Sequence, residues 1–87
     1  MPVTRIFIVE DDTFLSRMMQ LALEKLDDSE VVCFTNAEDC VANLHRRPDI
    51  VTIDYHLPGM NGISLMEHIK SFNSDITCIM VSGQDRL

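Results

Sequence analysis

Short apolar runs alternate along this chain with stretches in which apolar residues recur every three or four positions. Runs of the first kind predict β-strands, and stretches of the second kind predict amphipathic helices. The pattern predicts strands over residues 3–9, 30–35, 50–54 and 76–81, and helices over 13–27, 35–47 and 63–72. Because strands and helices alternate with short loops between them, we expect a parallel sheet with helices on both faces.

Capping residues mark the ends of these predicted helices. Asp12 or Thr13 suits the N-cap of the first helix, and Thr35 with Glu38 has the form of a capping box at the second. Pro48 is expected to end the second helix. The predicted buried faces are Leu15, Met18, Met19, Ala22 and Leu26 on the first helix, and Leu65, Met66, Ile69 and Phe72 on the third.

Two of the predicted strands end in carboxylates. The first runs into Glu10, Asp11 and Asp12, and the third ends at Asp54. If these strands are parallel neighbours, their acids meet at one edge of the sheet, where open α/β sheets place their sites. Two unit charges about 4 Å apart repel by roughly 4 kcal/mol at an effective dielectric near 20. Such a cluster therefore requires either a raised pKa or a bound cation, and oxygen ligands favour Mg²⁺ when a phosphoryl group is present.

Composition narrows the possible partners. The 87 residues suffice for one small domain, and 46% of them are hydrophobic, as in ordinary globular proteins. Seven Lys and Arg against 14 Asp and Glu give a net charge of −7, which argues against binding to nucleic acid or to an anionic membrane surface. No apolar run predicts a membrane span or a signal peptide. The three cysteines have no C-x-x-C spacing, so we expect reduced thiols and a cytoplasmic protein.

Three segments, taken together and in order, resemble the receiver domains of two-component response regulators. They are residues 6–12, residues 51–62 with the pattern D-x-x-L-P-x-x-x-G that starts at Asp54, and residues 79–83. The resemblance covers the whole chain. It implies a single domain over residues 1–87, a three-layer α/β sandwich with the flavodoxin-like strand order 2-1-3-4, and a function in signalling rather than in metabolic catalysis.

The resemblance also implies a role for each site residue. Asp54 would accept a phosphoryl group from a phosphohistidine on a sensor histidine kinase or a phosphotransfer protein. Asp11 would bind Mg²⁺ directly, Glu10 would act through a bound water, and the backbone carbonyl of His56 would be a further ligand. The hydroxyl of Ser82 would hydrogen-bond a phosphoryl oxygen. For Asp12 we favour helix capping over metal ligation.

The chain departs from the family pattern at its end. A receiver continues with a fourth helix, a fifth strand that supplies a lysine, and a fifth helix, whereas this sequence ends at Leu87 and has no Lys after Lys70. We therefore expect a C-terminally incomplete receiver, part of something longer. Otherwise another copy covers the fourth strand, which is apolar on both faces, in a homodimer.

Two other functions remain open at this point. The missing lysine favours a receiver-like scaffold that is not phosphorylated. An aspartyl-nucleophile phosphohydrolase is less favoured, because such enzymes place a second acid two residues after the nucleophile, and His56 stands there.

Overall fold

The computed structural model describes residues 2–81 of the chain, which form a parallel sheet in the order β2-β1-β3-β4. This order confirms the predicted topology. The strands are β1 (Thr4–Val9), β2 (Ser29–Phe34), β3 (Ile50–Asp54) and β4 (Thr77–Val81). Because β1 and β3 are neighbours in the sheet, the residues that follow them are brought to the same edge.

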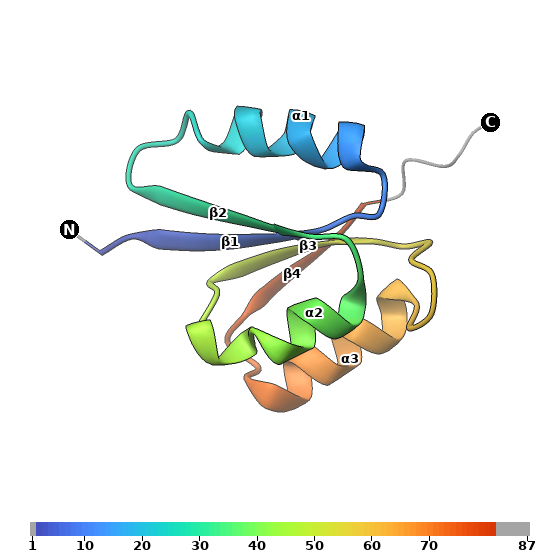
Figure 1. Ribbon diagram of the computed structural model, residues 1–87. Helices are drawn as coiled ribbons and strands as arrows, with labels where there is room; N and C mark the ends of the chain where they lie inside the picture. Colours follow the sequence, from blue (N-terminus) through green and yellow to red (C-terminus); the bar gives the residue numbers. More distant parts are fainter. Residues whose placement is uncertain (1, 82–87) are drawn as a thin grey trace.

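Helices cover both faces of this sheet, as predicted. Figure 1 shows α1 (Thr13–Leu23) on one side, and α2 (Ala37–Ala42) and α3 (Gly62–Phe72) on the other. A short 3₁₀ helix, η1 (Leu44–Arg46), follows α2. The predicted three-layer sandwich is therefore correct.

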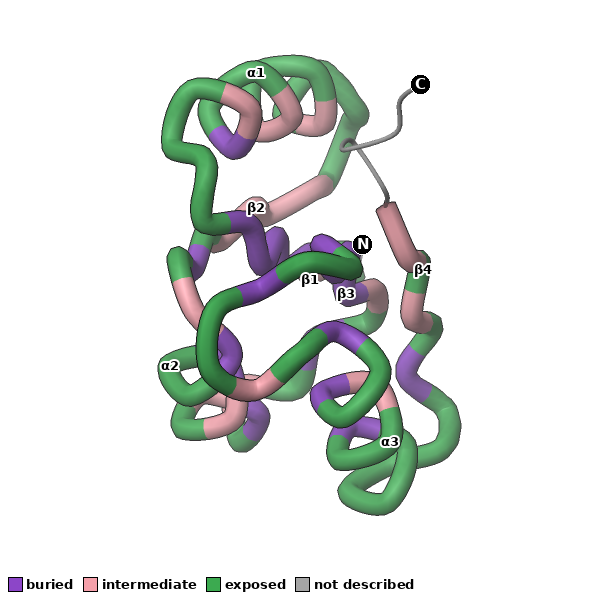
Figure 2. The backbone as a smooth tube through the Cα atoms, turned by 90° about the vertical axis from the view of Figure 1, so that its right-hand side faces the viewer, coloured by how far each residue is buried: buried purple, intermediate pink, exposed green. Residues whose placement is uncertain are grey.

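The main core lies between the sheet and the pair α2 and α3. Phe7 and Phe34 meet there edge to face, with ring centroids 4.9 Å apart. Figure 2 shows the buried backbone concentrated in β1, β3, α2 and α3, whereas α1 is mostly exposed. The buried residues of this core are Phe7, Val9, Phe34, Ala37, Cys40, Leu44, Val51, Ile53, Leu57, Leu65, Ile69 and Ile76.

The first helix ends at Leu23, four residues earlier than the sequence predicts. The hydroxyl of Ser29 donates hydrogen bonds to the carbonyls of Leu23 and Leu26, at 3.1 and 2.8 Å. Asp28 adopts a left-handed backbone conformation with φ of 58°. A side chain from the next strand thus satisfies the carbonyls at the helix end, and the chain turns there.

The second helix is capped one residue later than predicted. The Oδ1 atom of Asn36 accepts the amide hydrogen of Asp39 at 2.8 Å, and the Nδ2 of Asn36 donates to the Asp39 carboxylate at 3.1 Å. The expected capping box of Thr35 and Glu38 is therefore wrong by one position. The helix also does not continue to residue 47, because the chain tightens into η1 and Arg47 turns left-handed with φ of 62°.

The predicted buried faces of α1 and α3 are only partly correct. Leu15 and Met19 are half-buried, but Met18, Ala22 and Leu26 are exposed, and so is Phe72 at the end of α3. The physical reason on α1 is its position: among the described elements the helix packs chiefly against β1 and β2, so one narrow stripe of its surface faces the sheet. The apolar residues that recur along α1 therefore cover a wider surface of the helix than the stripe that contacts the sheet.

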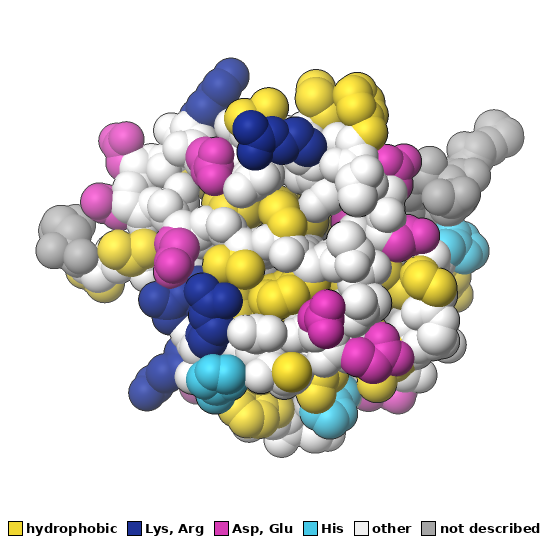
Figure 3. Space-filling view, viewed as in Figure 1, with side chains coloured by type: hydrophobic (Ala, Val, Ile, Leu, Met, Phe, Trp, Pro, Cys, Tyr) yellow, Lys and Arg dark blue, Asp and Glu magenta, His cyan; other side chains and the backbone are white. Residues whose placement is uncertain are grey.

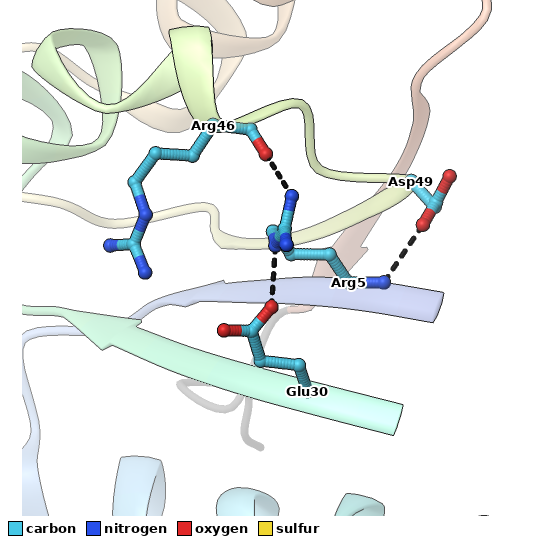
Figure 4. Close-up of polar contacts among 4 residues, drawn as sticks. All are labelled: Arg5, Glu30, Arg46 and Asp49. Carbon is cyan, nitrogen blue, oxygen red and sulfur yellow. Dashed lines mark hydrogen bonds and ion pairs between the residues drawn. The ribbon is translucent and has the colours of Figure 1, made fainter. Parts of the chain in front are cut away.

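A polar network ties the strands together at the end of the sheet where β1 begins (Figure 4). The Nε of Arg5 donates to the Glu30 carboxylate at 2.5 Å, and its Nη1 donates to the carbonyl of Arg46. The backbone N–H of Arg5 donates to the Asp49 carboxylate at 2.8 Å. One arginine on β1 therefore links β2, η1 and the segment between η1 and β3.

β4 forms one edge of the sheet, since within residues 2–81 it pairs with β3 alone. Ile79 on this strand is 46% exposed. None of the described helices is both long and apolar enough to cross a membrane.

Candidate functional site

The carboxylates that follow β1 and β3 meet at one edge of the sheet. Val9 pairs with Ile53 in the parallel register, which places the next residues, Glu10 and Asp54, side by side. One carboxylate oxygen from each of Glu10, Asp11 and Asp54 lies within 4.8 Å of the others. The sheet thus brings together the three acids that the sequence singled out, although Asp54 lies more than 40 positions from Glu10 and Asp11 in the chain.

Two members of this acidic cluster (Glu10, Asp11 and Asp54) are buried. Glu10 is 4% exposed and Asp54 is 3% exposed, whereas Asp11 is open to solvent. Burial raises the pKa of Glu10 from 4.5 to about 7, and repulsion from Asp54 and Asp11 acts in the same direction. The hydrogen bond from the backbone N–H of Asp12 opposes this rise. The sequence alone did not indicate that Glu10 would be this deeply buried.

Backbone amides orient the two buried carboxylates. The N–H of Asp12 donates to Oε2 of Glu10 at 3.0 Å, and the N–H of His56 donates to Oδ1 of Asp54 at 3.0 Å. The other oxygen of Asp54, Oδ2, is buried and has no donor among the described residues while Glu10 is ionised; a protonated Glu10 shares a side-chain hydrogen bond with Asp54. Buried carboxylate oxygens usually have partners, so this orphaned atom indicates a place for a ligand.

The donors of the acidic cluster fit a hard divalent cation. Three carboxylate oxygens converge, Asp54 has a buried Oδ2 atom without a donor among the described residues, and Glu10 is protonated more readily than usual, chiefly because it is buried and also because Asp54 and Asp11 repel its charge. Figure 3 shows Asp, Glu and His side chains at the end of the molecule where β1 and β3 finish, with no Lys or Arg among the described residues visible there. A cation would relieve the repulsion that this arrangement creates.

A cleft of about 400 Å³ opens beside the acidic cluster and shares Asp11 with it. His56 lines this cleft, and its exposed ring lies edge-on to Tyr55 with centroids 5.0 Å apart. The sequence predicts only a loop between residues 54 and 63 and does not indicate a cleft, although apolar residues such as Leu57 and Pro58 stand in that loop. The cleft is lined by Asp11, Tyr55, His56, Leu57, Pro58, Asn61 and Ile63.

Asp12 and Ser82 are the remaining residues for which the sequence predicted a role. Asp12 caps α1, because its Oδ1 accepts the amide hydrogens of Phe14 and Leu15 at 3.0 and 3.1 Å, as predicted. Ser82 lies outside the described residues.

Comparison with known proteins agrees with this geometry. The model of the family "Response regulator receiver domain" matches residues 6–87. A transcriptional regulatory protein FlgR from Helicobacter pylori is 32% identical over 83 residues, which are 95% of this chain and 21% of that protein. A protein-glutamate methylesterase/protein-glutamine glutaminase from Clostridium acetobutylicum is 32% identical over 81 residues, or 91% of this chain and 24% of that protein. The chain thus spans about a quarter of the length of these curated relatives.

Solved structures agree in fold. The crystal structure of a CheY-like response regulator receiver domain protein from Methanospirillum hungatei superposes with a TM-score of 0.87 at 29% identity, over 98% of this chain and 68% of that one. Because the family model matches nearly the whole chain, and the strand order and the clustered acids agree with it, this chain belongs to the receiver domains of two-component response regulators, which are phosphoacceptor switches.

Proposed function

We propose that Asp54 is the phosphoacceptor of this receiver. The observation that carries the proposal is the buried Oδ2 atom of Asp54, which has no hydrogen-bond partner within residues 2–81; Asp54 belongs to the acidic cluster at the edge of the sheet. An ionised carboxylate oxygen without a hydrogen-bond donor keeps its electron pairs available for attack on phosphorus.

The chain's own residues prepare that attack. The His56 amide holds Oδ1 of Asp54 by a hydrogen bond, which leaves Oδ2 as the nucleophile. A bond forms between Oδ2 and phosphorus, the phosphorus–nitrogen bond of the phosphohistidine breaks, and the imidazole nitrogen keeps the electron pair. Replacement of the carboxylate by an acyl phosphate adds charge and acceptor oxygens at this edge, which gives the surrounding loops a reason to rearrange.

Magnesium is the cofactor that the cluster supports. Asp11 and Asp54 are proposed as direct ligands, Glu10 as a ligand through water, and the backbone carbonyl of His56 as a further ligand. When bound, Mg²⁺ supplies positive charge that offsets the repulsion among the acids and the charge that develops on the phosphoryl group. Ser82, beyond the described residues, is proposed to hydrogen-bond a phosphoryl oxygen.

The partners follow from the family and from charge. Receiver domains interact with sensor kinases or phosphotransfer proteins, and we propose a sensor histidine kinase or a phosphotransfer protein as the donor. The net charge of −7 supports a domain that does not itself bind nucleic acid or a membrane. The free thiols of Cys33, Cys40 and Cys78 support a location in the cytoplasm. We propose that the domain is not an enzyme. The free edge of β4 supports a homodimer through that strand.

Two alternatives are less well supported. A scaffold that is not phosphorylated has no need of a buried acid with an orphaned oxygen, and a phosphohydrolase would place an acid where His56 stands.

Labelling by acetyl phosphate tests the acceptor. The variant Asp54→Ala is expected to lose Mg²⁺-dependent labelling entirely, because the nucleophilic oxygen is gone. Asp27→Ala, which removes an exposed acid from the loop before β2, is the control and should be labelled like the parent chain. Intact-mass spectrometry measures both, and undiminished labelling of Asp54→Ala would reject the assignment.

A further inference from the structure

Gly62, the first residue of α3, lies against the backbone that carries Asp54. A Cβ atom at this position would lie 2.6 Å from the carbonyl oxygen of Asp54, 3.1 Å from Cα of Tyr55 and 2.9 Å from Cε of Met80. Gly62 does not have a left-handed backbone conformation, unlike Gly59, whose φ is +72°. The glycine is therefore required here for space and not for conformation.

The backbone of Tyr55, which follows Asp54, is held from both sides. The N–H of Tyr55 donates to the carbonyl of Val81 on β4 at 3.0 Å, and the N–H of Gly62 donates to the carbonyl of Tyr55 at 3.4 Å. The close approach of Gly62 is what permits the second of these contacts. The end of β3 is thereby fixed between a neighbouring strand and the first turn of α3.

We propose that Gly62 is a positioning residue for the Asp54 carboxylate, an inference that rests on the proposed function of Asp54. The absent side chain lets α3 begin directly on the Asp54 carbonyl, which sets where Asp54 leaves the strand relative to Glu10 and Asp11. Sites of this kind need their groups held within about 0.5 Å. Since Cβ contacts under 3.0 Å are essentially never seen, a Cβ at residue 62 must shift either the Asp54 carbonyl or the start of α3, and both are backbone that cannot move aside as a side chain does.

The binding of Mg²⁺ alone, without a phosphoryl donor, tests this proposal. We expect Gly62→Ala to weaken the Kd for Mg²⁺ by about tenfold, as is usual when a group that orients a metal ligand is disturbed. Gly59→Ala is the matched control: it strains a left-handed turn in the same loop, where the nearest atom to an added Cβ is a flexible Glu38 oxygen at 3.3 Å. The control should lose thermal stability and keep its Kd within about twofold.

A second variant separates positioning from packing. Gly62→Ala combined with Met80→Ala removes the side-chain contact at residue 80 but leaves the contact with the Asp54 carbonyl. Positioning predicts that the Kd stays about tenfold weaker in the double variant. Recovery of the parent Kd would show that Gly62 serves only core packing, and would overturn the proposal. If Gly62→Ala alone does not fold, the Kd for Mg²⁺ is measured on the double variant instead.

A metal-free measurement keeps this inference separate from the proposed function. The His56 amide donates to Asp54 Oδ1, so hydrogen exchange and the NMR shift of that amide report where the carboxylate lies. We expect faster exchange of the His56 amide in Gly62→Ala and no change in Gly59→Ala. If the parent chain binds no Mg²⁺, the metal site proposed above fails while this test still applies. An unchanged His56 amide in Gly62→Ala would contradict the positioning role.

Discussion

The carboxyl group of Glu10 shows how the site is built at the scale of a single residue. Burial at the end of β1 disfavours its charged form, and the nearby acids add repulsion, so its pKa rises from 4.5 to about 7. One backbone N–H, from Asp12, partly offsets this. In these surroundings the ionised form of Glu10 destabilises the folded chain. A bound cation would make the ionised form favourable.

The raised pKa of Glu10 predicts a particular pH dependence of stability. Between about pH 4.5 and 7 the unfolded chain releases the Glu10 proton while the folded chain keeps it, so this group lowers the free energy of unfolding as the pH rises. Glu10→Gln lacks this effect and should gain stability relative to the parent chain across that window. Urea unfolding at pH 5 and pH 8 measures the difference.

The control for this prediction is the same substitution at the exposed Glu67 of α3, which removes one negative charge away from the cluster. Saturating Mg²⁺ should stabilise the parent chain more at pH 8 than at pH 5, because binding needs the deprotonated carboxylates. An equal effect of Mg²⁺ at both pH values would contradict the role given to Glu10.

At the scale of secondary-structure elements, the sequence predicted each strand and helix, and the errors lie at the ends. The second helix begins after Asn36 instead of Thr35, because Asn36 and Asp39 satisfy each other's hydrogen bonds. The first helix ends early because the hydroxyl of Ser29 reaches back to its last carbonyls. Each of these stretches contains several side chains that could cap a helix, and the folded backbone determines which of them forms the capping hydrogen bonds.

Arg5 joins β1 to β2 and to η1, so its replacement should weaken the contacts among all three elements. Arg5→Met removes the donors to Glu30 and to the Arg46 carbonyl and keeps much of the aliphatic stem. The ion pair is partly exposed and contributes little by itself, so we expect a loss of about 1–2 kcal/mol that comes chiefly from the unpartnered carbonyl. Chemical denaturation with an unchanged m-value measures it.

Arg17→Met is the matched control for Arg5→Met. Arg17 is exposed on α1, where its guanidinium donates to Gln20 of the same helix at 3.2 Å. Its replacement should change the free energy of unfolding by no more than about 0.5 kcal/mol. Equal effects of the two substitutions would mean that the Arg5 network does not hold the elements together.

At the scale of the whole molecule, β2 and β4 are the two edge strands of the sheet within the described residues. β4 presents a free edge among the described residues, and Ile79 on that strand is 46% exposed. Unpaired N–H and C=O groups beside an apolar side chain favour pairing with another strand. This surface is the one that supports the proposed homodimer.

Substitution on β4 tests that interface. Ile79→Lys should shift the protein toward the monomer and weaken self-association at least about tenfold, because a charge would be buried against the partner strand. Leu26→Lys, at an apolar position outside the sheet that is 55% exposed, should leave association unchanged. Analytical ultracentrifugation across a concentration series measures both, and a parent chain that stays monomeric at every concentration would rule out the dimer.

The sequence by itself determined the alternation of strands and helices, the parallel sheet and the choice of Glu10, Asp11 and Asp54, because hydrophobic period and strand-end chemistry are local properties. Only the tertiary structure decided that Glu10 is buried, that one oxygen of Asp54 has no partner in the described part of the chain, and that Gly62 leaves space for the Asp54 carbonyl. The reason is physical: burial, orphaned polar atoms and close backbone contacts depend on residues that are distant in the chain and meet only when the layers pack.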